Sequence, residues 1–399
     1  MDYRRFPLLA AIASVLCFCG ADWLQFRGND ANGVAGDVKE PISVAAAKWT
    51  TELTGRGASG PIVIGDRIVL TSCSGFEQDR LHVHLFDAAT GKQVWERQFW
   101  ATGRTMCHPK MSVATPTPAS DGERIFAFYS SNDVACLDLE GNLLWFRGLT
   151  HDYPNASNSL GMASSPIVVG KTLILQVEND TDSFATGLNV ETGIAKWKID
   201  RPQSVNWTSP SLFRADDGDD LVLLQSSKGL SAIKPETGMA VWRYSSANST
   251  IPSVVVSENT VFAPSDGLVA LQPTAELTSE PKEIWHQAKF KSATPSPLVY
   301  EGRVYTVNSS GVVTCGDSQT GEVAWRLRLE GPISATPVAA GGLLYFFNEK
   351  GVAQVVEPGL KKGEIIERRE FGETILCTPA IAAGALFVRS DAHLWKLTK

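Results

Sequence analysis

The sequence predicts an all-β fold: an eight-bladed β-propeller of four-stranded antiparallel blades, closed by an N-terminal strand. Three observations lead to this prediction. A turn motif that ends in Trp recurs along the chain, a second motif of small residues followed by Pro recurs out of phase with it, and the last repeat is one strand short. Repeats of about 42 residues with several short strands each are typical of propeller blades.

The first motif is a tight turn followed by a strand, with Trp four residues after the Gly. Gly suits the left-handed position of such a turn, because a Cβ there would be penalised. An aromatic residue at the same height in every repeat indicates that it fills the same gap between neighbouring repeats. The motif occurs at Asp87–Trp95, Asp138–Trp145 (one residue shorter), Glu191–Trp197, Glu236–Trp242 and Asp317–Trp325.

The second motif marks the innermost strand of each blade. Pro lacks an N–H donor, so a strand tolerates it where that donor would have no partner, as on an edge that faces a central channel. Small residues before the Pro suit the crowded axis, and the Trp strands are then the outermost. The markers are Pro61, Pro116, Pro166, Pro210, Pro252, Pro295, Pro337 and Pro379.

The ends of the chain complete the count of strands. The seventh repeat has Glu367 in place of the expected Trp, and the eighth stops at Leu397 after three strands. The segment Val44–Trp49 has the sequence of an outer strand and can complete the eighth blade, which leaves no open end. We therefore expect residues 22–43 to lie on the propeller and residues 44–399 to form it.

The Asp-x-x-Thr-Gly-x-x-x-Trp turns preceded by Ser/Thr-Pro strands resemble the quinoprotein-type (PQQ-like) repeat over residues 44–399. That repeat forms the propellers of PQQ-dependent alcohol dehydrogenases and of BamB-like proteins of outer-membrane assembly. The resemblance implies the fold. It does not by itself imply the function.

Composition excludes some classes of partner and indicates export. The net charge is −7 and no basic run occurs, so nucleic acid is not an expected partner. Residues 1–21 have the charged start, apolar stretch and small-residue cleavage site of a signal peptide, and the apolar stretch is short for a membrane span. We expect a monomer in the periplasm or cell envelope, with no transmembrane span in the mature chain. A lipid anchor is the less favoured alternative, because Cys17 and Cys19 follow bulky residues.

Polar loops before the inner strands of blades two to four predict a ligand-binding face at the channel mouth. Loops that enter the inner strands gather at one end of the channel. The alternative is that these loops only fill the channel with hydrogen bonds among themselves. The candidate ligand-binding residues are His108, Lys110, Asn155, Asn158, Asp180, Asp182, Asn206 and Trp207.

No metal site or catalytic residue is predicted. Met106, Cys107, His108 and Met111 are soft ligands but define no geometry, and packing between blades explains the His82 and His84 pair better than two isolated ligands do. The run Asp216–Asp220 reads as an exposed hairpin turn rather than a calcium loop. Most of the mature-chain cysteines are expected to be buried small hydrophobes; they are Cys73, Cys107, Cys136, Cys315 and Cys377.

Two functions remain open. The first is a non-catalytic binding or scaffold module of the cell envelope, BamB-like, that holds an envelope protein or a small polar ligand at its loop-rich face and needs no cofactor. The second is a periplasmic PQQ-dependent alcohol or sugar dehydrogenase, which would require PQQ and calcium. Against the second, the chain lacks both the vicinal Cys-Cys pair of those enzymes and a Cys-x-x-Cys-His haem motif.

Overall fold

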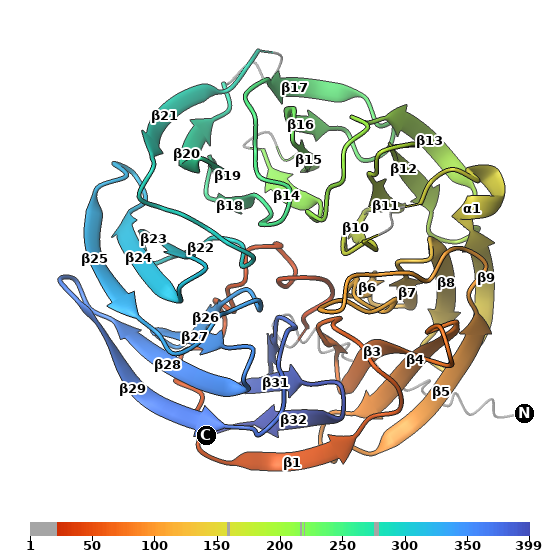
Figure 1. Ribbon diagram of the computed structural model, residues 1–399, viewed down its shortest axis with the longest axis horizontal. Helices are drawn as coiled ribbons and strands as arrows, with labels where there is room; N and C mark the ends of the chain where they lie inside the picture. The colour runs from red at the N-terminus through yellow and green to blue at the C-terminus, as the bar shows by residue number, and fades with distance from the viewer. Residues whose placement is uncertain (1–21, 158–159, 216–217, 219, 275–278) are drawn as a thin grey trace, which may run out of the picture.

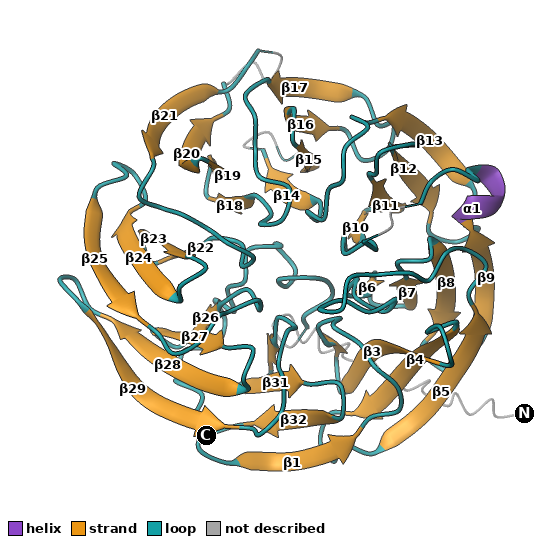
Figure 2. Ribbon diagram, viewed as in Figure 1, coloured by secondary structure: helices purple, strands orange, loops and turns teal. Residues whose placement is uncertain are grey.

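The computed structural model describes residues 22–157, 160–215, 218, 220–274 and 279–399. Eight antiparallel four-stranded sheets surround a common centre, and the red N-terminal segment crosses that centre (Figure 1). Strands and loops make up nearly all of the described chain, with one short helix, α1 (Leu149–Asp152), at the rim (Figure 2). The predicted eight-bladed fold is confirmed. The signal peptide prediction falls on residues 1–21, which lie outside the described residues.

Each blade runs from the channel outward in chain order. Blades 1 to 4 consist of β2 (Ile62–Ile64), β3 (Arg67–Ser74), β4 (Arg80–Asp87) and β5 (Gln93–Trp100); β6 (Ala119–Ser120), β7 (Arg124–Phe128), β8 (Asp133–Asp138) and β9 (Leu143–Gly148); β10 (Ile167–Val169), β11 (Thr172–Val177), β12 (Phe184–Asn189) and β13 (Ala195–Asp200); and β14 (Ser211–Arg214), β15 (Asp220–Ser226), β16 (Gly229–Ile233) and β17 (Ala240–Tyr244).

Blades 5 to 7 follow the same plan, and blade 8 takes its outer strand from the start of the chain. They consist of β18 (Val255–Ser257), β19 (Thr260–Ser265), β20 (Gly267–Gln272) and β21 (Lys282–Gln287); β22 (Leu298–Tyr300), β23 (Arg303–Val307), β24 (Val312–Asp317) and β25 (Val323–Arg328); β26 (Val338–Ala340), β27 (Leu343–Phe347), β28 (Val352–Pro358) and β29 (Gly363–Glu370); and β30 (Ala380–Ala382), β31 (Ala385–Arg389), β32 (His393–Leu397) and β1 (Ala47–Glu52).

Trp residues of six outer strands dock their blade onto the next. The indole N–H of Trp95 donates to the carbonyl of Leu139 in the turn of blade 2 at 3.0 Å, and a Cβ on Gly141 of that turn would lie 2.9 Å from the same indole. Gly is therefore needed for close approach as well as for its left-handed φ. The same contact recurs in five further pairs: Trp49 with Ala88, Trp145 with Val190, Trp197 with Pro235, Trp285 with Ser318, and Trp325 with Gly359.

Glu367 replaces Trp in blade 7 because the next blade offers donors instead of an acceptor. The outer strand of blade 8 is β1, so the segment facing Glu367 is the chain just before β1. The carboxylate accepts hydrogen bonds from the Ser43 hydroxyl at 2.7 Å and from the Val44 N–H at 3.0 Å. A Trp indole can donate only, so it could satisfy neither group.

The N-terminal strand closes the ring as predicted. β1 pairs antiparallel with β32 over five residue pairs, from Ala47 with Leu397 to Glu52 with His393. Residues 22–43 then cross the end of the channel toward which the inner strands run. Trp23 exchanges two backbone hydrogen bonds with Val63 of β2, and Ala35 donates to Ala339 of β26. One end of the channel is thereby covered by the chain itself.

Candidate functional site

A ring of hydroxyl groups lines the other end of the channel, where the inner strands begin. The backbone N–H of one residue donates to the Ser or Thr hydroxyl at the same position of the next blade, with distances of 2.8 to 3.1 Å. Each such residue stands two positions before the first residue of its inner strand. The ring runs from Gly60 through Thr117, Ser165, Ser209, Ser253, Ser296 and Thr336 to Thr378.

This ring corrects the phase of three Pro markers. The hydroxyl residue precedes Pro118 in blade 2, Val254 in blade 5 and Pro297 in blade 6, each two residues later than the marker expected from the sequence. Thr-Pro occurs twice in succession in blade 2, and only the hydrogen bond between blades distinguishes the two. The small residue before the inner strand is therefore a hydrogen-bond acceptor, and not simply a residue that fits a crowded axis.

The Ser and Thr residues of this ring line a cavity of about 370 Å³. Phe26 of the N-terminal segment, which crosses the covered end of the channel, is also a lining residue. Another part of the cavity wall comes from the long loops that precede β6, β10 and β14. The lining residues that these loops and the blade-5 entry contribute are His108, Lys110, Met111, Thr115, Leu160, Ala163, Trp207 and Ile251.

Three of the eight predicted ligand-binding residues line this cavity. The side chains of His108, Lys110 and Trp207 all contribute to its wall. The Lys110 ammonium reaches across to blade 7 and contacts both carboxylate oxygens of Glu349 at 2.7 and 2.9 Å. The Trp207 indole donates to the carbonyl of Gly161 at 2.9 Å, which ties the loops of blades 3 and 4 together.

The other predicted residues lie elsewhere. Asn206 is buried and donates to Glu178 at 2.9 Å and to the Gln225 carbonyl at 2.7 Å, so it belongs to an internal network. Asn155 and Asp180 are exposed beside that network, on loops joined by a hydrogen bond from Thr181 to the Asn155 carbonyl. Asp182 is half-buried, and its carbonyl accepts from Asn179. Asn158 lies outside the described residues.

Glu178 explains why that network is structural. Its side chain is 1% exposed, and burial raises the pKa of the carboxyl although Arg201 lies 2.5 Å away. Two amides, Asn206 and Gln176, complete its hydrogen bonds. A buried carboxylate with all its acceptors in use has no capacity left for a ligand.

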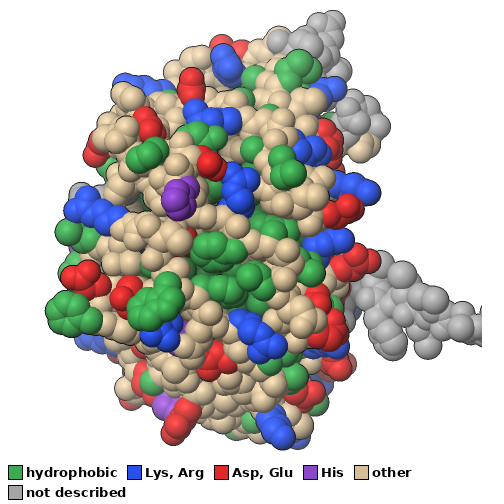
Figure 3. Space-filling view, turned by 90° about the vertical axis from the view of Figure 1, so that its right-hand side faces the viewer, with side chains coloured by type: hydrophobic (Ala, Val, Ile, Leu, Met, Phe, Trp, Pro, Cys, Tyr) green, Lys and Arg blue, Asp and Glu red, His purple; other side chains and the backbone are tan. Residues whose placement is uncertain are grey.

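Three large apolar side chains are exposed at one edge of the loop-rich end, a feature that the sequence analysis did not identify. Phe76 at the tip of the β3–β4 hairpin is 99% exposed, Trp100 at the end of β5 is 61% exposed, and Met106 in the following loop is 53% exposed. The guanidinium of Arg80 lies 3.8 Å above the Trp100 ring. We name Phe76, Trp100 and Met106 the apolar edge. Figure 3 looks onto the side of the ring that carries β5 and shows hydrophobic side chains between charged ones.

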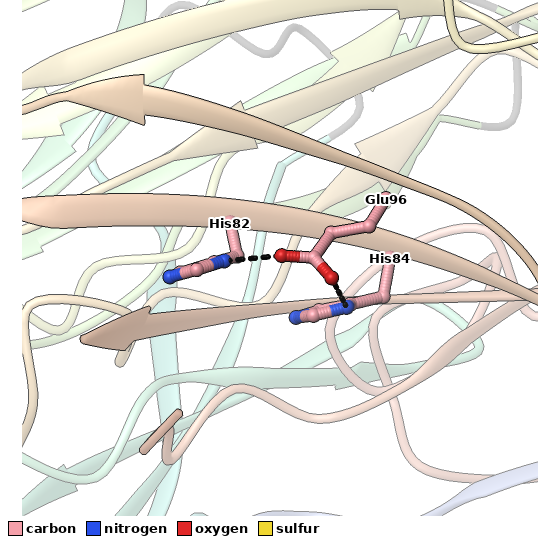
Figure 4. Close-up of side chains that lie close together, drawn as sticks. All are labelled: His82, His84 and Glu96. Carbon is pink, nitrogen blue, oxygen red and sulfur yellow. Dashed lines mark hydrogen bonds and ion pairs between the residues drawn. The ribbon is translucent and has the colours of Figure 1, made fainter. Parts of the chain in front are cut away.

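A second polar cluster lies in blade 1, away from the cavity. His82 and His84 of β4 are 2% and 0% exposed, with parallel rings 5.7 Å apart, and Glu96 of β5 places its carboxylate between them (Figure 4). His82 Nδ1 is 2.6 Å from one carboxylate oxygen, and His84 Nδ1 is 4.0 Å from the other. Burial lowers the pKa of His84 to about 4. Glu96 is the third group of this cluster, and only the pairing of β4 with β5 brings it to the two histidines.

The weaker sequence candidates contribute no further cluster within the described residues. Met106 is exposed in the loop, while Cys107 accepts a hydrogen bond from Gln78. Of the five cysteines from Cys73 onward, four are buried as expected, and Cys107 is half-buried. The acidic run at 216–220 includes residues outside the described part. No helix among the described residues is long and apolar enough to span a membrane.

Known proteins resemble this chain in sequence and in fold. Outer membrane protein assembly factor BamB of Legionella pneumophila (strain Paris) is 25% identical over 185 residues, which is 43% of this chain and 47% of that protein. The alignment thus spans about half the length of that relative. The structure of BamB from Moraxella catarrhalis is similar with a TM-score of 0.65 at 17% identity, covering 90% of this chain and 98% of that one. A europium-containing methanol dehydrogenase is similar with a TM-score of 0.70 at 12% identity, covering 95% and 98%.

The two structural matches show the fold alone, because both sequences are less than 25% identical to this chain. The family model is more specific. Residues 43–160, 83–326 and 277–358 match the model described as outer membrane protein assembly factor BamB, and together these matches extend from residue 43 to residue 358. The chain therefore belongs to this BamB family of PQQ-like repeat propellers.

Proposed function

We propose that the protein is an exported binding module of the cell envelope, BamB-like in outer-membrane protein assembly, that holds a partner protein at its loop-rich end. The observation that carries this proposal is the apolar edge. Aromatic residues, Met and Arg are enriched at protein interfaces. Here Phe76, Trp100 and Met106 are exposed, Arg80 packs on the Trp100 ring, and Arg104 contacts the Met106 sulfur. Exposed apolar groups of this size on one edge favour a protein partner.

The apolar edge adjoins the mouth of the cavity. Gln78 of the same hairpin donates to Cys107, and the loop continues to His108 and Lys110 on the cavity wall. A partner segment bound on the edge could therefore place a polar group among the channel hydroxyls. This arrangement retains the predicted role of His108 and Lys110 and adds the contacts that supply affinity.

The cavity walls do not fit the PQQ and calcium that the alternative function, a dehydrogenase, would require. Calcium, which that cofactor requires, binds carboxylate and carbonyl oxygens. The described residues that line the cavity include no Asp or Glu, and the carboxylate of Glu349, which contacts two lining residues, is held by Lys110 and by the Ser334 hydroxyl. We therefore propose binding rather than dehydrogenase activity.

Replacing the apolar edge is expected to release the partner. The triple variant Phe76→Ala, Trp100→Ala, Met106→Ala should reduce the recovery of co-purifying envelope proteins at least tenfold, since truncating one interface hot spot costs about 2 kcal/mol or more. The measurement is quantitative co-purification with the tagged chain from its native host after cross-linking.

The matched control is Ile194→Ala, Met239→Ala, Leu360→Ala, which removes three other apolar side chains that are each more than half exposed, from turns at the outer rim. Equal recovery with both triple variants would contradict the proposed face.

Adding PQQ with calcium to the purified chain is expected to give neither quinone absorbance after gel filtration nor dye-linked oxidation of alcohols. The reason is the lack of carboxylate ligands in the described cavity wall. Retention of stoichiometric quinone with alcohol oxidation would establish the dehydrogenase instead.

A further inference from the structure

We propose that His82, His84 and Glu96 bind one divalent transition-metal ion, for which Zn²⁺ is the best match. Their ligand atoms all lie within 4.8 Å of one another. The arrangement follows from strand geometry. Residues 82 and 84 alternate onto one face of β4, and Glu96 is the direct antiparallel partner of His84 on β5. The site is independent of the loop-rich end and of the proposed function.

Hydrogen bonds fix which nitrogen of the His84 ring is free to bind a metal ion. The Ser72 hydroxyl donates its only hydrogen to the Thr54 carbonyl at 2.6 Å. Its oxygen is also 2.7 Å from His84 Nε2, so it must accept a hydrogen bond from that nitrogen. Neutral His84 then carries its proton on Nε2 and presents a lone pair at Nδ1. Within the described structure that Nδ1 is buried and has no hydrogen-bond partner.

The result is two acceptors that face each other with no donor between them. The Nδ1 lone pair of His84 and one oxygen of Glu96 are 4.0 Å apart (Figure 4). A buried polar atom without a partner costs about 1–3 kcal/mol, more when a charge is near. A cation held between the two acceptors removes this cost and explains why the pair is oriented inward.

The surroundings have the features of a metal site rather than of a chance cluster. Ligating imidazoles normally form a hydrogen bond through their second nitrogen, and here both do so with β3 hydroxyls, His82 with Ser74 and His84 with Ser72, each at 2.7 Å. The Glu96 carboxylate is itself oriented by the amide of Gln98 at 2.8 Å.

The donor set selects the class of ion. Two imidazole nitrogens and one carboxylate suit Zn²⁺ and its first-row neighbours, whereas calcium and magnesium prefer oxygen ligands alone. Zn²⁺ bonds of about 2.0–2.2 Å place tetrahedral ligand atoms about 3.3–3.5 Å apart. The carboxylate must therefore move from His82 toward His84, a shift available to a side chain on an outer strand that is 21% exposed.

The positive charge of Arg389 is expected to weaken the binding of a metal ion at this site. The guanidinium of Arg389 acts on His84 across the interface between blades 8 and 1, held there by the Thr71 carbonyl at 2.7 Å. With a single anionic ligand, the site does not neutralise a divalent ion completely. We therefore expect micromolar rather than nanomolar affinity.

The test is Zn²⁺ titration of the untagged, EDTA-stripped mature chain by calorimetry, with Co²⁺ absorption as a report on coordination. A Cys107→Ala background removes the half-buried thiol as a rival ligand. We expect one Zn²⁺ per chain, a higher melting temperature with Zn²⁺, and the visible bands of four-coordinate Co²⁺.

Glu96→Gln is expected to weaken Zn²⁺ binding at least 100-fold and to stay folded, because the new amide can donate to the free Nδ1 of His84. Ser72→Ala should weaken binding about 10–100-fold by releasing the ring of His84. The matched control, His151→Ala with His286→Ala, removes two exposed histidines and should bind like the parent.

Failure of the parent chain to bind Zn²⁺, as expected if a water molecule bridges Glu96 and His84, would overturn the proposal. So would equal affinity and stoichiometry in the parent and in folded Glu96→Gln.

Discussion

Removal of residues 22–52 is expected to abolish the cooperative folding of the whole ring. The deletion takes away the fourth strand of blade 8 and the segment that covers one end of the channel. Trp23, Ile42 and Val44 are at most 3% exposed, and burial of each such side chain contributes about 1.5–3 kcal/mol. Their sum alone approaches the about 5–15 kcal/mol by which domains are stable. The measurement is chemical unfolding followed by Trp fluorescence and circular dichroism.

A rearranged chain distinguishes the contribution of β1 to stability from that of residues 22–43. Ala47 pairs with Leu397, so a short turn after Lys399 can lead into a copy of residues 47–53 and form a β32–β1 hairpin. We expect this chain, begun at residue 54, to recover a cooperative transition of lower midpoint, because it still lacks residues 22–43. A deletion variant that unfolds as cooperatively as the parent would show that closure does not stabilise the ring.

Gly238→Ala is expected to lower the free energy of unfolding by about 3 kcal/mol or more, and Trp197→Ala by about 3–5 kcal/mol. We expect the effects of the two substitutions to be strongly coupled. Gly238 has φ of +70°, and a Cβ there would lie 2.7 Å from the Trp197 ring of the preceding blade. The left-handed backbone accounts for about 1–2 kcal/mol, and the collision with the indole accounts for the rest. The measurement is a double-mutant cycle of unfolding free energies.

Gly302→Ala isolates the backbone contribution. Gly302 has φ of +72°, yet no atom lies within 4 Å of the position of its Cβ. We expect a cost of about 1–2 kcal/mol there, and the same cost for Gly238→Ala once Trp197 is already Ala. If Gly238→Ala lowered the free energy of unfolding equally in the parent and in the Trp197→Ala background, Gly238 would be required only for the left-handed φ of the turn and not for the contact with Trp197.

The site was predictable only in part. The loops that carry His108, Lys110 and Trp207 could be placed at one end of the channel, because the Pro and Trp patterns fix the direction of every inner strand. Asn206 could not be distinguished from a ligand-binding residue, since its role depends on Glu178, a residue 28 positions away that faces it only in the folded chain. Phe76 offered no pattern, because one exposed aromatic residue has no periodicity.

The sequence alone determined the architecture: eight repeats, their inner and outer strands, and the closure by Val44–Trp49. It could do so because each repeat makes the same local and nearest-neighbour contacts, which leave the same residues at the same spacing. Only the tertiary structure decided which side chains contact each other at positions that are not repeated from blade to blade. Glu96 joins His82 and His84 through the β4–β5 register, Lys110 reaches Glu349 across the channel, and Glu367 holds the chain at Ser43. These contacts occur once each, and pairing or closure of the ring is needed to bring their partners together.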